Sequence, residues 1–106
     1  MAETTAVLYS AGTDGCWVEL FGPARLAAGI RDVIVPLPAT TRVADLVRAL
    51  AETCPALAEA NILDVTGGVA GEGYVLNRNG REFLARPDMT VSPGDHLLLL
   101  SSAVGG

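Results

Sequence analysis

The residues of this chain best suited to chemistry stand at its end, where Gly105 and Gly106 follow the sequence Ser-Ser-Ala-Val. Glycine has no Cβ, so two glycines form a slim segment that fits a narrow channel. The α-carboxylate of a terminal glycine, with an ordinary pKa of about 3.3–3.7, is ionised at neutral pH and unshielded by any side chain. We therefore expect the Gly106 carboxylate to enter another protein's active site, with Gly105, Val104 and Ala103 threading behind it. Ordinary fraying of a chain end accounts for the two glycines equally well.

The remaining reactive side chains do not form a catalytic constellation. His96 is the only histidine and stands beside Asp95 on a predicted strand. Acid–base catalysis needs a partner group and a pocket, which a small open sheet rarely offers, so we expect a partly exposed histidine and an aspartate that caps its turn. Cys16 and Cys54 lack the spacing of a disulfide framework or zinc site and are read as reduced thiols. The sequence predicts no catalytic residue, no metal site and no enzymatic activity of its own.

The composition of the 106 residues is that of one folded domain, since 50% are hydrophobic and 18% are charged. The formal net charge of −5 argues against nucleic acid or an anionic membrane as partner. All seven basic residues are arginines, so the chain offers no lysine side chain for isopeptide linkage. No signal peptide is recognisable, and no apolar run approaches the roughly 18 residues of a membrane span. We expect a cytoplasmic protein.

The first half of the chain predicts two strands and a helix. Residues 16–21 read as a strand with Val18 and Leu20 on one face, and with Glu19 and two aromatic side chains on the wetter face. A short connection over residues 24–29 leads to a second strand over residues 30–37, so an antiparallel hairpin is expected. The helix that follows has Thr40 or Thr41 as its N-cap and ends before Pro55. Its single apolar stripe consists of Val43, Leu46, Val47, Leu50, Ala51 and Cys54.

The second half predicts short elements and a final strand. Residues 56–63 read as a short helical piece, and the four glycines within 66–73 as a flexible surface loop, because no helix follows that could bind phosphate. Residues 74–84 read as strand, turn and strand around Asn79-Gly80. A Pro-Gly-Asp turn at 93–95 opens the last strand. Its leucines alternate between the two faces, and reading the inward positions from the turn assigns Leu97 and Leu99 to the core. The other face of this strand, shared with the first strand if the two are neighbours, forms a predicted partner-binding surface of Leu98, Leu100, Phe21 and Trp17.

The predicted order of elements is β-β-α-β-β-β, which describes an α+β protein with a β-grasp (ubiquitin-like) fold. We expect a mixed sheet of four to five strands with one main helix packed on one face. Residues 1–15 are interpreted as an N-terminal leader, residues 16–100 as the β-grasp domain and residues 101–106 as a flexible tail.

Four short segments of the chain resemble the ThiS/MoaD family of ubiquitin-like sulfur carriers. They are Leu-Phe-Gly-Pro-Ala-Arg at 20–25, Val-Ala-Asp-Leu at 43–46, Val-Leu-Asn at 75–77, and Pro-Gly-Asp at 93–95 followed by an apolar strand and Gly-Gly. The last segment is the most specific. The resemblance as a whole covers roughly residues 16–106.

This resemblance implies a function for the tail. In the family, an E1-like enzyme joins the terminal glycine carboxylate to AMP from ATP, and sulfide equivalents then displace AMP to give a thiocarboxylate. The carrier binds no cofactor, because the activating enzyme uses the ATP. The implied partners are that E1-like adenylating enzyme, a sulfurtransferase or sulfide source, and a sulfur-accepting synthase.

The sequence departs from its relatives in ways that leave the pathway open. Molybdopterin-synthase small subunits usually carry a proline-rich step where this chain has Ser101-Ser102-Ala103, and thiazole-pathway carriers lack much of residues 55–73. Its length is nearer to carriers that serve cysteine, cofactor or secondary-metabolite synthesis. The alternatives are the small subunit of molybdopterin synthase, a ubiquitin-like protein modifier, and a β-grasp interaction module without tail chemistry.

Overall fold

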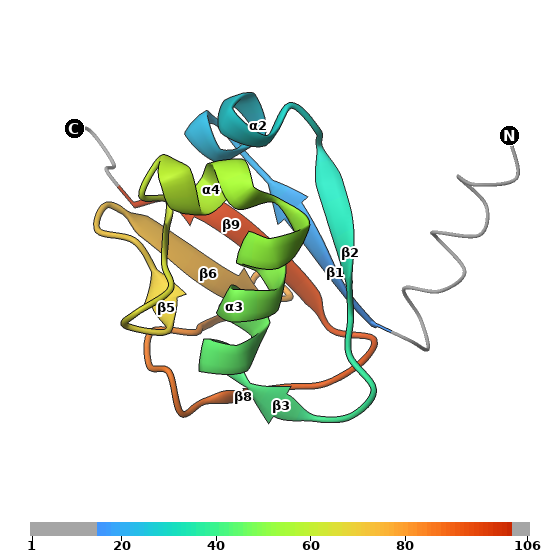
Figure 1. Cartoon of the computed structure of the whole chain (residues 1–106). Coiled ribbons are helices and arrows are strands. Elements are labelled where there is room, and N and C mark those ends of the chain that lie inside the picture. The colour runs from blue at the N-terminus through green and yellow to red at the C-terminus, as the bar shows by residue number, and fades with distance from the viewer. Residues whose placement is uncertain (1–14, 103–106) are drawn as a thin grey trace, which may run out of the picture.

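The computed structural model describes residues 15–102, whose short helices and strands form a small α+β domain (Figure 1). In chain order the elements are β1 (Gly15–Leu20), α2 (Pro23–Ala28), β2 (Asp32–Pro36), β3 (Thr41–Arg42), α3 (Val43–Thr53), α4 (Pro55–Glu59), β4 (Leu63–Asp64), β5 (Val69–Ala70), β6 (Tyr74–Arg78), β7 (Glu82–Phe83), β8 (Thr90–Val91) and β9 (His96–Ser101).

The centre of the fold is a five-stranded sheet with the strand order β2-β1-β9-β6-β7. The strands β1 and β9 lie side by side and run parallel, whereas the other neighbouring pairs are antiparallel. Helix α3 crosses one side of this sheet, with α4 beyond its end (Figure 1). The predicted β-grasp, a mixed sheet with one main helix on one face, is confirmed.

A single hydrophobic core fills the space between α3 and the sheet. Strand alternation turns Val18, Leu20, Leu97 and Leu99 toward the helix, where all four are fully buried. The apolar stripe of α3 meets them through its buried residues Val43, Leu46, Val47 and Leu50. Each such side chain stabilises the fold by about 1.5–3 kcal/mol relative to an exposed one. The core of the described chain therefore lies on one side of the sheet.

The start of α3 differs from the prediction, because neither Thr40 nor Thr41 caps it. The first helical amides are satisfied by backbone carbonyls instead: Val43 N–H donates to Met89 at 2.7 Å and Ala44 N–H to Pro87 at 3.1 Å. The residues just before the helix form β3, which pairs with β8 and brings those carbonyls into place. A capping side chain is therefore not required.

The connection between the first two strands, over residues 24–29, contains a helix that was not predicted. Pro23–Ala28 forms the short helix α2. Pro23 stands at its first position, where no backbone N–H is needed, and the Gly29 N–H closes its end by donating to the Arg25 carbonyl at 2.8 Å. The strands on either side, β1 and β2, are antiparallel as predicted.

The glycine-rich stretch over residues 66–73 is not the flexible loop that was predicted. It contains β5, which pairs with β4, and Gly68 packs against Ala44 of α3. The Gly71 N–H donates to the Ile62 carbonyl at 2.8 Å. The glycines in this stretch allow close packing.

Three other predictions are confirmed. The short helix α4 overlaps the predicted helical piece over residues 56–63, and α3 ends before Pro55. The turn at Asn79-Gly80 joins β6 to β7 and is closed by a hydrogen bond from the Arg81 N–H to the Arg78 carbonyl at 3.0 Å. None of the helices within residues 15–102 has the length and apolar character needed to cross a bilayer.

Candidate functional site

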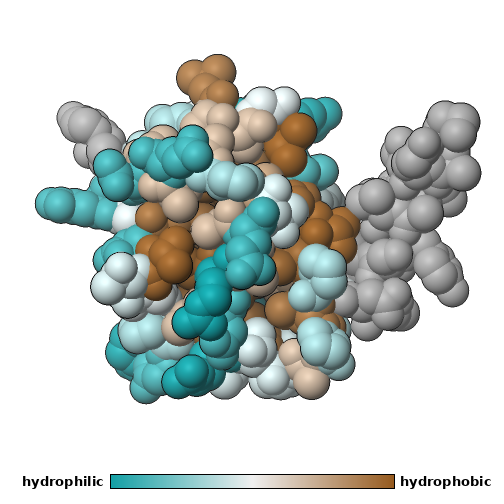
Figure 2. All heavy atoms as spheres, in the orientation of Figure 1, coloured by the Kyte–Doolittle hydropathy of each residue, from teal (hydrophilic) through white to brown (hydrophobic). Residues whose placement is uncertain are grey.

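The side of the five-stranded sheet that faces away from α3 carries a broad apolar surface, which we call the open face. In Figure 1 the helices α3 and α4 lie on the near side of the sheet, so the open face is on the far side. Figure 2 shows the near side, where hydrophilic side chains extend across the region of α3. By strand alternation and register, the open face consists of Trp17, Glu19, Asp32, Ile34, Val75, Asn77, Phe83, His96, Leu98 and Leu100, with Phe21 at its end.

The leucines of β9 divide between the two sides of the sheet as predicted. Leu97 and Leu99 are fully buried in the core, whereas Leu98 and Leu100 are half-buried on the open face. Trp17 and Phe21 are also half-buried, and the register places Trp17 beside His96 in the neighbouring strand. The four residues predicted as a partner-binding surface therefore belong to one side of the sheet.

His96 is fixed by two contacts on the open face. Its ring stacks on Trp17 with the centroids 4.2 Å apart and an angle of 11° between the planes. Its Nε2 atom lies 2.7 Å from Oε1 of Glu19. Glu19 was not predicted as a partner of His96, although a parallel pairing of β1 with β9 brings alternating residues of the two strands to one face. The two contacts hold His96 in place on the open face.

Asn77 on β6 is a polar residue in the middle of this apolar face. Its side chain is only 6% exposed, and its Oδ1 atom has no hydrogen-bond partner within residues 15–102. Its register neighbours are Leu98 on β9 and Phe83 on β7, neither of which offers a side-chain donor. The open face thus contains a buried acceptor without a donor.

The chain leaves the sheet at the end of β9, its central strand. The Phe21 N–H donates to the Leu99 carbonyl at 3.2 Å, and the Ser102 N–H donates to the Gly73 carbonyl at 2.8 Å. The Arg25 guanidinium lies 5.8 Å from the centre of the Phe21 ring. The end of β9 is therefore held on the β1 side at Leu99 and on the β6 side at Ser102. The predicted reacting end, Gly106, and the threading residues Ala103, Val104 and Gly105 lie outside the described residues.

Asp95 stabilises the turn before β9, as predicted. Its Oδ2 atom accepts hydrogen bonds from the Ser92 N–H at 2.9 Å and from Arg78 Nη1 at 3.3 Å. Arg78 also donates to Glu82, and this hydrogen bond is the main cause that raises the pKa of the guanidinium. The group is a structural ion-pair network.

Both cysteines are buried and free, and both are kept neutral by their surroundings. Burial, followed by the negative charge of Asp95, raises the pKa of the Cys16 thiol to about 12, against a smaller lowering by Arg78. Burial also raises the pKa of Cys54. Because the thiolate is the reactive form, neither residue is a candidate nucleophile.

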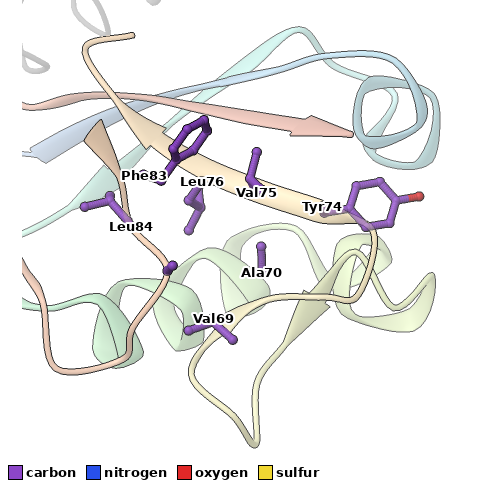
Figure 3. Close-up of a pocket in the computed structure, with 8 residues that line it drawn as sticks. Val69, Ala70, Tyr74, Val75, Leu76, Phe83 and Leu84 are labelled. Atoms are coloured by element: carbon purple, nitrogen blue, oxygen red, sulfur yellow. The ribbon is translucent and has the colours of Figure 1, made fainter. Parts of the chain in front are cut away.

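A small pocket of about 130 Å³ opens beside β6 at the edge of the sheet (Figure 3). In this view Val75 and Phe83 point to one side of β6, and Leu76 points to the other. The residues that line the pocket are apolar apart from the hydroxyl of Tyr74. Within residues 15–102, no three side chains of the types that bind metals come together.

The topology and the uncovered sheet face define a ubiquitin-like β-grasp protein. No family model matches the sequence, and no curated protein matches it. Solved structures do resemble it. SAMP1 from Haloferax volcanii is 29% identical with a TM-score of 0.70, over 87% of this chain and 99% of that one.

Two further structures place the fold more narrowly. A putative molybdopterin converting factor, subunit 1, from Pyrococcus furiosus is 25% identical with a TM-score of 0.62, over 84% of this chain and 98% of that one. The small archaeal modifier protein 1 from Methanosarcina acetivorans, at 19% identity and a TM-score of 0.56 over 88% and 97% of the two chains, supports the fold alone. The chain therefore has the ThiS/MoaD-type ubiquitin-like fold, as its sequence predicted. The similarities support a place among the ubiquitin-like sulfur carriers and modifiers.

Proposed function

We propose that this protein is a sulfur carrier whose Gly106 carboxylate is adenylated by an E1-like enzyme and converted to a thiocarboxylate. The observation that supports the proposal is the position of β9. This strand is paired with β1 on one side and β6 on the other, and the residues after Ser102 are Ala-Val-Gly-Gly. A strand held on both sides gives the tail a rigid base, while small residues suit entry into a narrow active site.

The chemistry needs no catalytic side chain from this protein. The Gly106 carboxylate oxygen attacks the α-phosphorus of ATP, pyrophosphate leaves, and an acyl-adenylate forms. Hydrosulfide from a sulfide source, or its equivalent from a sulfurtransferase, then attacks the acyl carbon, so that the bond to AMP breaks and a carbon–sulfur bond forms. A synthase then accepts the sulfur and uses it in the biosynthesis of cysteine, a cofactor or a secondary metabolite. ATP is a substrate of the activating enzyme, and the carrier itself binds no cofactor.

The open face supplies the surface on which the activating enzyme would dock. Trp17, Phe21, Leu98 and Leu100 are half-buried apolar residues on the side of the sheet not covered by α3. The tail continues from β9, the strand that carries Leu98 and Leu100 and whose Leu99 carbonyl accepts the Phe21 N–H, so an enzyme that covers this face would also reach the tail. Aromatic and aliphatic side chains in such positions are typical of binding hot spots.

The structural neighbours favour two alternatives. Similarity to the molybdopterin converting factor subunit favours the small subunit of molybdopterin synthase, whose thiocarboxylated tail would enter a larger catalytic subunit. Similarity to SAMP1 favours a ubiquitin-like modifier joined to lysines of other proteins. Co-purification of a stoichiometric larger subunit would identify the first, and conjugates recovered on lysines of other proteins would identify the second.

The proposal is tested by ATP–pyrophosphate exchange with purified E1-like enzymes from the same organism. We expect one of them to exchange pyrophosphate into ATP only when this chain is present. A chain that lacks Gly105 and Gly106 but keeps the described domain serves as the control. Absence of exchange with every such enzyme would contradict the carrier and modifier functions together.

A further inference from the structure

Two carboxylates stand opposite each other on the open face. Glu19 of β1 is the register partner of Asp32 of β2. Like charges directly opposite on one face of a sheet repel each other, so the pair does not stabilise the domain. The Asp32 side chain is exposed and makes no hydrogen bond or ion pair within residues 15–102. Glu19 uses one oxygen for His96, and no described residue donates to the other. The two carboxylates therefore retain free acceptor capacity.

The surroundings of this pair are apolar and contain few positive charges. Trp17 and Leu98 are the nearest neighbours of Glu19 in register on β1 and β9. Arg31, next to Asp32 in sequence, occupies the position opposite Leu20 and so belongs to the other side of the sheet. The Arg25 guanidinium donates a hydrogen bond to the Leu20 carbonyl and lies over the Phe21 ring. Nothing in the described chain neutralises Asp32.

The buried amide of Asn77 adds a third acceptor to the same face. Its Oδ1 lacks a donor within residues 15–102, and its register neighbour Phe83 is 60% exposed. Glu19, Asp32 and Asn77 thus share one property: each has acceptor capacity that the isolated domain does not use. A partner that matches this face must bring hydrogen-bond donors and positive charge together with apolar side chains.

We propose that the open face binds a basic and apolar surface of the E1-like activating enzyme, with an arginine or lysine of the enzyme placed against Glu19 and Asp32. The inference rests on the proposed function for the identity of the partner, whereas the chemistry of the partner surface follows from the face itself. The cation would relieve the repulsion between the two carboxylates, and the apolar surface around them would strengthen the interaction by excluding water. The enzyme would thereby be aligned over the sheet from whose central strand, β9, the tail continues.

The first test measures the KM for this chain in ATP–pyrophosphate exchange. The variant Glu19→Gln/Asp32→Asn replaces both carboxylates with neutral amides of similar shape. The glutamine at position 19 can still form a hydrogen bond with His96. The control Glu52→Gln/Glu59→Gln removes two exposed carboxylates from α3 and α4 on the other side of the molecule. We expect the first variant to raise KM about tenfold with kcat unchanged, and to weaken the salt dependence of KM. A KM within twofold of that of the control would overturn the proposal.

The second test does not depend on the proposed function. Trp17 is the only tryptophan and lies beside the carboxylates, so its indole NMR signal and fluorescence report on the face. The probes are the dipeptide N-acetyl-leucyl-arginine amide and its neutral analogue with citrulline. We expect the arginine probe to shift the Trp17 signals in the native chain and not in Glu19→Gln/Asp32→Asn. An equal response to both probes, or no response to either, would overturn the charge complementarity even if no activating enzyme is found.

Discussion

At the scale of single residues, neighbouring leucines of β9 point to opposite sides of the sheet. Leu97 is fully buried against α3, whereas Leu98 is half-buried on the open face. We predict that Leu97→Arg destabilises the domain by roughly 4 kcal/mol or more, because it buries an unpaired charge. Leu98→Arg should leave the thermal melt nearly unchanged and weaken binding to the activating enzyme. Thermal melts and enzyme titrations of both variants would check this, and the reverse pattern would refute the assignment of the two faces.

Asn77 offers a second test at this scale. Replacing it with leucine removes the buried oxygen that lacks a donor and keeps a similar side-chain volume. We predict that Asn77→Leu stabilises the domain by about 1–2 kcal/mol, since the desolvation cost of the amide disappears. Differential scanning calorimetry should show a higher Tm, with Val75→Leu on the same strand as a control that removes no polar group. A lower Tm for Asn77→Leu would mean that the amide is satisfied in solution.

Cys16 gives the fold a dependence on alkaline pH. Its folded-state pKa is raised from 9.0 to about 12, chiefly by burial. The unfolded chain therefore loses the thiol proton at lower pH than the folded chain, so stabilisation is present below pH 9 and is lost as pH rises toward 12. We predict that the free energy of unfolding falls less steeply across this range in Cys16→Ala than in the native chain. Denaturant titrations at several pH values would show it, and parallel curves would contradict it.

At the scale of elements, the hairpin of β4 and β5 depends on close backbone contact at Gly71. A Cβ on Gly71 would collide with the backbone carbonyl oxygen of Asn61, whereas one on Gly73 would meet nothing within 4 Å. Gly73 instead has a φ of 89°, which strains an L-residue. We predict that Gly71→Ala costs roughly 3 kcal/mol and Gly73→Ala roughly 1 kcal/mol. Urea unfolding of the two variants tests the ranking, which equal losses would contradict.

Elements with a long periodic pattern were predictable from the sequence, and short ones were not. The apolar stripe of α3 repeats often enough to fix the buried face of the helix. Strand β9 has four consecutive leucines, so its buried face could be assigned only by reading from the turn before it. Helix α2 has only six residues, so no stripe develops, although Pro23 at its start and Gly29 at its end are typical helix boundaries. The N-cap of α3 could not be predicted locally, because its acceptors come from residues 87 and 89.

The same distinction holds for the candidate site. Alternation along β9, read from the turn that precedes it, assigned Leu98 and Leu100 to the open face, and the parallel pairing of β1 with β9 places Trp17 on the same face. The contact between His96 and Glu19 depends on the register of that pairing, which the sequence did not specify. The role of these residues in binding a partner stays a prediction.

At the scale of the whole molecule, the residues that stabilise the fold are not those proposed to react. The core lies between α3 and one side of the sheet, and the proposed reactive group lies on a tail beyond the last strand. Changes at residues 105 and 106 should therefore leave the melting temperature unaffected while they decide whether the protein is a substrate.

The central claim is tested most directly by intact-mass spectrometry of three chains: the native one, one without Gly106, and one with a single residue added after it. Each is incubated with the activating enzyme, ATP and sulfide, and its fold is checked by a thermal melt. We predict identical melts, and only the native chain should gain the mass expected when sulfur replaces one oxygen. Conversion of the extended chain, with its extra residue still present in the spectrum, would contradict the account.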